Sequence, residues 1–182
     1  GAVVALTLAC GAMVWRQQTH ANLSVPVAAS DSSRSGPIPS RRMWVLLSFV
    51  PASWLLAVTT KVTGDLVPNP MLWVVPLSIY LLTYILAFSR WAGVLHVWML
   101  RAFPITVLVL LFLRSDSLVQ EMVKHLAVFF VGAMVFHGEL ARRRPDTTRL
   151  TAFYVWMAVG GLCGGVFNSL VAPLVFPSFW EY

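Results

Sequence analysis

The sequence predicts an all-α polytopic membrane protein with about six transmembrane helices, several of them kinked by proline. Of its 182 residues, 58% are hydrophobic and 11% are charged, and apolar stretches long enough to cross a bilayer recur along the chain. The chain carries 13 Lys and Arg against 7 Asp and Glu, an excess typical of loops beside membrane spans. A soluble enzyme is therefore excluded, and the positive charge does not call for a nucleic acid partner.

The first 42 residues predict two segments. Residues 1–15 are apolar from Gly1 onward and end at Trp15 beside Arg16, so we interpret them as the end of a transmembrane helix. Residues 16–42 are rich in Ser and Pro and contain four arginines, which predicts a flexible, basic, cytoplasmic linker. Because both ends of the sequence are apolar and no Met begins it, we expect a piece of a longer protein.

Residues 43–182 predict a five-helix transmembrane region. The charge-poor windows that predict its helices are residues 43–60, 70–89, 91–113, 121–138 and 150–180. Arg101 interrupts the third window, and because a buried arginine costs about 2.5 to 3.5 kcal/mol at a helix centre, it is expected to face protein, water or headgroups. Proline removes a backbone donor inside four of these windows, at Pro51, Pro76, Pro104 and Pro173.

The distribution of basic residues predicts the orientation. Three loops, all on one side of a six-span arrangement, hold nine of them: Arg16, Arg34, Arg41, Arg42, Arg90, Arg142, Arg143, Arg144 and Arg149. The alternating loops hold three, which are Lys61, Arg114 and Lys124. The positive-inside rule places the nine in the cytoplasm, so we expect a multi-pass protein of a bacterial inner (cytoplasmic) membrane.

A run of glycines predicts close helix packing. Two glycine pairs are spaced four apart, Gly160 with Gly164 and Gly161 with Gly165, which lets another helix approach the backbone. Asn168 lies eight residues after Gly160, on nearly the same face. We expect it either to hydrogen bond across this contact or to meet a solute.

Three histidines are candidates for binding a cofactor. His96, His125 and His137 could each serve as an axial ligand to a haem or a chlorophyll-type pigment. His125 and His137 are predicted near the membrane interfaces, however, where a hydrated histidine is the alternative. Twelve residues separate these two, about 18 Å along a helix, so they cannot share a metal ion, and no metal site is expected.

Four polar residues could line a path for a solute. Lys61 and Asp65 lie at a predicted helix break, where such a path could open, although an ordinary outer turn capped by Asp65 is the alternative. Arg101 and Asn168 would complete the path.

Near the end of the fourth window, Glu139 lies three and four residues before Arg142 and Arg143, which predicts ion pairs on a hydrated basic turn. No Ser/His/Asp order, CxxC, HExxH or pair of intramembrane carboxylates is found in the sequence. We therefore expect no enzymatic activity.

Two stretches resemble the membrane portion of bacterial fused major-facilitator/spermidine-synthase-like proteins. They are PASWLLAVTTKVTGDLVPNPMLWVVPLSIYLLTYILAF at 51–88 and HGELARRRPDTTRLTAFYVWMAVGGLCGGVFNSLVAPLVF at 137–176. The resemblance implies a partial major-facilitator-like bundle, with residues 1–15 ending one half and the later helices forming most of the next. The soluble synthase domain of that family is not found in the sequence, so aminopropyl transfer is not implied. The Gly-x-x-x-Asp-Arg loop of major-facilitator proteins is not found either.

Three classes of function follow. The first is a non-enzymatic, transporter-like membrane domain that moves a small solute. The second is an accessory subunit that packs through its glycine face against other transmembrane helices of a larger respiratory or photosynthetic complex. The third is a redox or pigment subunit that uses one of the three histidines. The bilayer is a partner in each case.

Overall fold

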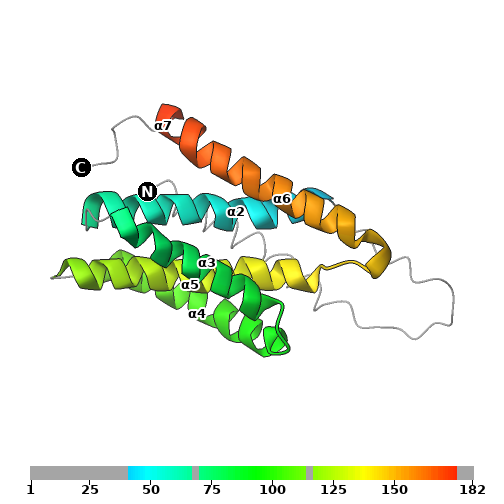
Figure 1. Cartoon of the computed structure of the whole chain (residues 1–182). Coiled ribbons are helices and arrows are strands. Elements are labelled where there is room, and N and C mark those ends of the chain that lie inside the picture. Colours follow the sequence, from blue (N-terminus) through cyan, green and yellow to red (C-terminus); the bar gives the residue numbers. More distant parts are fainter. Residues whose placement is uncertain (1–40, 67–69, 114–116, 176–182) are drawn as a thin grey trace. The chain divides into compact units, whose positions relative to one another are not determined.

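The structure is a computed structural model that describes residues 41–66, 70–113 and 117–175. These residues form helices joined by short turns, with no strand among them (Figure 1). Four helical stretches are long and apolar enough to cross a membrane, Arg41–Gly64, Ala92–Phe112, Leu118–Arg142 and Thr147–Leu174, and Met71–Ala87 forms a shorter apolar helix. The predicted all-α membrane class is thus confirmed. The predicted span at 1–15 and the predicted linker up to residue 40 lie outside the described residues.

The first described helix, α2, spans Arg41–Thr60. It begins two residues before the predicted boundary, and Arg41 lies over the ring of Trp156, a cation–π contact that fixes the start of the helix. A π-helical turn, η1 (Lys61–Leu66), continues it, so the helix does not break at Lys61 as predicted.

A short helix follows. A 3₁₀ turn, η2 (Pro70–Trp73), leads into α3 (Val74–Ala87). Pro76 lies in the first turn of α3, where backbone N–H groups have no partner within the helix, so it causes no break there. Together Met71–Ala87 rise about 25 Å, less than the roughly 30 Å of a hydrocarbon core, and α3 is thus shorter than the predicted span of 70–89.

The fourth predicted span is longer than expected. After α4 (Ala92–Phe112), α5 runs from Leu118 to Arg142, compared with a predicted 121–138. Its start is stabilised by Ser117, whose side chain accepts a hydrogen bond from the Gln120 N–H. Lys124 pairs with Glu121 at 2.8 Å one turn apart, so the polar residues at this end are accommodated within the helix.

The last predicted span is interrupted. A 3₁₀ turn, η3 (Thr147–Arg149), precedes α6 (Leu150–Val166), which is followed by a π-helical turn, η4 (Phe167–Val171), and by α7 (Ala172–Val175). Pro173 has no N–H to donate to the carbonyl of Ser169, so the regular pattern fails there. The π-helical turn accommodates this gap, as expected for a proline break.

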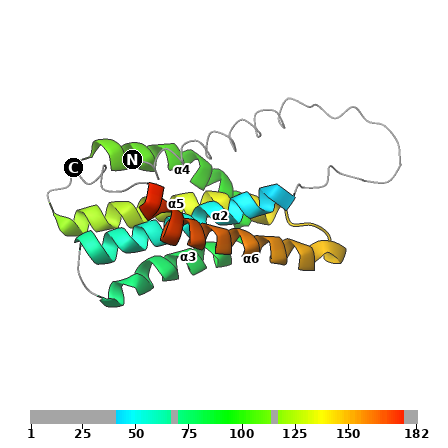
Figure 2. The same ribbon diagram turned by 90° about the horizontal axis from the view of Figure 1, so that it is seen from above.

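Helix α2 lies between α6 and α5 (Figure 1). It runs parallel to α6, because Val45 and Phe49 of α2 face Gly160 and Gly164 of α6 in the same order. On its other side the ring of Trp54 occupies the space beside Gly132 of α5. Figure 2 shows α3 and α4 on either side of α5.

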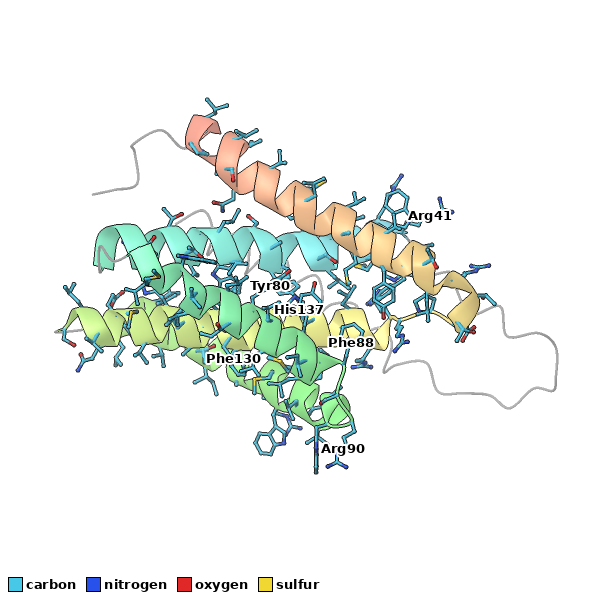
Figure 3. All side chains as sticks on the ribbon, in the orientation of Figure 1. Arg41, Tyr80, Phe88, Arg90, Phe130 and His137 are labelled. Carbon is cyan, nitrogen blue, oxygen red and sulfur yellow. The ribbon has the colours of Figure 1, made fainter. Side chains whose placement is uncertain are left out.

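One end of these helices gathers the basic residues. The start of α2 meets the end of α5 there, since Trp44 Nε1 donates to the carbonyl of Arg143 at 3.3 Å. Arg41 and Arg90 lie at this same end (Figure 3). Lys61 lies at the opposite end of α2. Arginines at one end of the described helices are thus separated from Lys61 at the other, while Arg101 lies midway along α4.

Candidate functional site

The last turns of α5 combine complete burial with polar residues. Every residue from 131 to 140 is buried, and this stretch includes His137 and Glu139. The buried polar side chains nearby come from two more helices: Thr83 of α3 is 0% exposed and His96 of α4 is 1% exposed, compared with 0% for His137 and 6% for Glu139. Polar groups buried this deeply need partners.

His137 faces α3. Thr83 Oγ1 lies 2.9 Å from His137 Nδ1 and 2.7 Å from the carbonyl oxygen of Tyr80, to which it donates. Because the hydroxyl has only one proton, both contacts are satisfied when His137 Nδ1 carries the proton and donates to Thr83. In this tautomer His137 Nε2 presents a lone pair.

Two tyrosines enclose the same ring. The ring of Tyr84 stacks on His137 with centroids 3.8 Å apart, and Tyr80 meets it edge-on at 5.0 Å. Figure 3 shows Tyr80 and His137 beside each other between α3 and α5. Since the imidazole is held on its face, on its edge and at Nδ1, its orientation is fixed by α3.

Glu139 faces α4 and the end of its own helix. Its Oε1 accepts a hydrogen bond from Arg143 Nε at 2.6 Å, the short distance of a charge-assisted bond. Its Oε2 lies 3.6 Å from His96 Nε2, within range of electrostatic attraction but too long for a hydrogen bond. The predicted pairing with Arg143 is confirmed, whereas the predicted hydrated turn is wrong for Glu139, because α4 covers it.

Gly138 allows His96 to come this close. A Cβ atom at residue 138 would collide with Nδ1 of His96 and would lie 3.1 Å from its Cγ. The absence of a side chain at this position therefore lets the imidazole lie directly on the backbone of α5.

Four buried atoms of this cluster have no hydrogen-bond partner among the described residues. They are His96 Nδ1, His96 Nε2, His137 Nε2 and Glu139 Oε2. Leaving a buried polar atom unpaired costs about 1 to 3 kcal/mol. The arrangement of these atoms therefore lowers the free energy of unfolding. We call His96, Glu139, Arg143, His137 and Thr83 the α5 polar cluster.

The α5 polar cluster lies close to the basic end of the helices. Glu139 comes three residues before Arg142, the last residue of α5, and His96 comes four residues after Ala92, the first of α4. These separations correspond to about 4.5 and 6 Å along the helix axes. Arg143 is half-buried, so it connects the buried carboxylate to this end of the protein.

The predicted solute path is not assembled in one place. Lys61 and Arg101 are exposed, and the side chain of Asp65 is outside the described residues. Asn168 Nδ2 donates to the carbonyl of Ser53 at 3.0 Å, which links η4 to α2 as the sequence analysis expected of it.

The four glycines differ in their surroundings. A Cβ atom on Gly160 would collide with the carbonyl of Val45, and one on Gly164 would lie 2.5 Å from the carbonyl of Phe49. These two glycines thus pack against the backbone of α2. Gly161 has no neighbour within 4 Å among the described residues, and Gly165 meets only the side chain of Leu56, at 4.0 Å.

The histidines also differ in their surroundings. His125 is half-buried, and its Nδ1 lies 2.9 Å from the carbonyl of Glu121 within its own helix. The predicted hydration is wrong for His137, because α3 covers the ring. Among the described residues no group of three or more His, Cys, Asp and Glu side chains could hold a metal ion.

Two contacts of α5 were not predicted from the sequence, that of Thr83 with His137 and that of His96 with Glu139. His96 and Glu139 were considered separately, as a cofactor ligand and as a surface ion pair. The available signal was Gly138 next to Glu139, because a glycine inside an apolar helix marks a close approach by a neighbour. Thr83 carried no signal of its own, since threonine is common in transmembrane helices.

Comparison with protein-family models, with curated proteins and with solved structures finds no match to this chain.

Proposed function

We propose that this chain is a non-enzymatic, transporter-like membrane domain, and that the α5 polar cluster is the polar site on its solute path. The observation that carries the proposal is that three helices bury ionisable and polar side chains while leaving four of their polar atoms unpaired. Ionisable groups inside membrane helices are costly and mark substrate and ion pathways. The resemblance to major-facilitator-related proteins supports the same class.

The position of the cluster suggests its part in transport. It lies at the basic end, where Arg143 and the exposed Arg142 add positive charge. A solute that enters from this end would meet the cluster before the apolar middle of the helices. Asn168 and Ser53, which meet further from this end between η4 and α2, would then serve a later step of the path.

The experiment is an accumulation assay with the full chain in liposomes. The liposomes are incubated with a mixed extract of small polar metabolites, washed, and their contents are compared by mass spectrometry with those of empty liposomes. We expect at least one solute to accumulate, and its accumulation to fall at least about tenfold in Glu139→Gln. Glu121→Gln is the matched control, because Glu121 lies on the same helix and also contacts a histidine.

Two results would contradict the proposal. The first is that wild-type liposomes accumulate nothing beyond empty ones. The second is that Glu121→Gln and Glu139→Gln reduce accumulation equally, because the α5 polar cluster would then have no special part.

An accessory role in a larger membrane complex is the second candidate. Two features favour it: Arg101 is exposed halfway along α4, and Gly161 faces open space on α6. An arginine facing lipid at the centre of a span is costly, so a helix of another subunit would stabilise it. If this is the function, Gly161→Leu weakens assembly in mild detergent, whereas a variant that remains fully associated contradicts it.

A haem or pigment subunit is the third candidate, favoured by the unpaired Nε2 atoms of His96 and His137. Either nitrogen could ligate an iron or magnesium centre axially. The absorption spectrum of the purified protein decides, since a Soret or near-infrared band that disappears in His137→Ala or His96→Ala would support this candidate and its absence would remove it.

A further inference from the structure

We propose that the α5 polar cluster binds a proton between Glu139 Oε2 and His96 Nε2, and that this proton is the coupling ion. The inference rests on the proposed transport function and names the ion that its site takes. Its basis is the distance between these two atoms. They face each other at 3.6 Å, both buried, and neither has a hydrogen-bond partner among the described residues.

A single proton closes this gap. With Glu139 as a carboxylate and His96 neutral in the tautomer that carries its proton on Nδ1, a proton added between Oε2 and Nε2 forms an O–H···N or an N–H···O hydrogen bond, which draws the two atoms to about 2.7 to 2.9 Å. Two acceptors of the cluster are satisfied by this one proton.

The charge of the cluster changes in a defined way. Without the added proton, the negative charge of Glu139 is balanced by Arg143, which donates to Oε1 at 2.6 Å. With it, the cluster gains one positive charge, and the attraction that holds the guanidinium to Oε1 weakens. Arg143 is half-buried at the basic end, so it can turn toward water while the proton is bound.

The charged and titratable groups around Glu139 come from each neighbouring element. From α4 the group is His96, and from the end of α5 they are Arg143 and, less directly, Arg142. Helix α3 presents Tyr80 and Tyr84 to the adjacent His137. Helix α2 contributes Trp44, which does not titrate and donates to the Arg143 carbonyl.

These neighbours favour a proton over a metal cation. Hard cations prefer several oxygen ligands, whereas Glu139 Oε2 has an imidazole as its neighbour and the other carboxylate oxygen is occupied by a guanidinium. A sodium or potassium ion would have to displace Arg143, and its oxygen ligands from the side chains that contact Glu139 would be the two carboxylate oxygens alone. A proton needs only the two atoms that already face each other.

The experiment is infrared difference spectroscopy of the full chain in lipid nanodiscs during a pH titration. We expect a protonated-carboxyl band that appears on acidification, is lost in Glu139→Gln and is retained in Glu121→Gln. His96→Gln should move the midpoint of this band by about one pH unit or more, equivalent to a tenfold change in proton affinity. Replacing choline chloride with sodium chloride should leave the midpoint unchanged.

Three results would overturn the proposal: a band that survives in Glu139→Gln, a midpoint that His96→Gln does not move, or a midpoint that depends on sodium. The outcome is independent of the accumulation assay. A Glu139 band without solute accumulation supports the proton site and contradicts transport, whereas accumulation without that band supports transport and contradicts the proton site.

Discussion

The hydroxyl of Thr83 holds the ring of His137 from a neighbouring helix, while its proton is donated to the carbonyl of Tyr80. Thr106 of α4 has only the second kind of contact, a bond to the carbonyl of Phe103 at 2.8 Å. A comparison of the two threonines therefore separates two contributions to stability, that of the contact between helices and that of the hydrogen bond within one helix.

We expect Thr83→Val to lower the free energy of unfolding by about 1 to 3 kcal/mol, because it leaves His137 Nδ1 buried without an acceptor. Thr106→Val should change it by less than about 1 kcal/mol, since only a local bond is lost. Unfolding by a denaturing detergent in mixed micelles measures both. Equal losses would show that the Thr83–His137 contact contributes nothing.

Gly138 and Gly93 provide a second comparison between single residues. A Cβ atom at residue 138 would collide with His96, whereas one at residue 93 meets nothing within 4 Å among the described residues. We expect Gly138→Ala to destabilise the protein by about 1 to 3 kcal/mol through overpacking, and Gly93→Ala to be neutral or slightly stabilising. The same unfolding measurement applies, and a neutral Gly138→Ala would mean that His96 moves away at no cost.

The contact between α2 and α6 depends on two of the four glycines. Gly160 and Gly164 place their backbone against carbonyls of α2, and Asn168 adds a hydrogen bond to Ser53 further along the same contact. Since the helices meet through backbone atoms, no rotation of a side chain can relieve an added methyl group.

We therefore expect Gly160→Ala to weaken the packing of α2 with α6, with a loss of about 1 to 3 kcal/mol, and Gly161→Ala to have no such effect. Disulfide crosslinking between cysteines introduced on α2 and α6 in a cysteine-free background measures the contact. If Gly160→Ala crosslinks as efficiently as Gly161→Ala, the close approach is not needed.

Much of the helical arrangement could be predicted from the sequence. Charge-poor windows predicted α2, α4, α5 and α6, because lipid leaves little choice of secondary structure. The end of α5 could not be predicted: Glu139 and Arg143 look like a surface pair in one dimension, and their burial is caused by α4, which lies about 40 residues away in the chain. Likewise, Gly161 and Gly160 are equivalent in sequence, and only the direction of the helix face decides which one meets α2.

For the molecule as a whole, Arg41, Arg90 and Arg143 lie at one end of the described helices and Lys61 lies at the other. From the positive-inside rule we expect Arg90 and Arg144 in the cytoplasm and Lys61 on the other side. This arrangement requires the short helix α3 to cross the membrane. Only then does Arg90, which follows α3, lie on the same side as the other arginines.

Cysteine labelling tests this topology. In a background with Cys10 and Cys163 replaced by serine, we expect Arg90→Cys and Arg144→Cys to react with a membrane-impermeant thiol reagent only after the cytoplasmic side is opened. Lys61→Cys should react in intact cells. Should the cysteines at 90 and 144 react from opposite sides, α3 does not cross and the topology is wrong.

The parallel pairing of α2 with α6 also has a consequence for biosynthesis. Ser53 and Asn168, which meet in the finished protein, are 115 residues apart in the chain, and at about 5 to 20 residues per second a ribosome needs roughly 6 to 23 s to make that stretch. During this interval α2 is already inserted, but the face that packs against Gly160 and Gly164 has no helix beside it. The nascent chain must therefore be shielded by lipid or by the insertion machinery until its last long helix arrives.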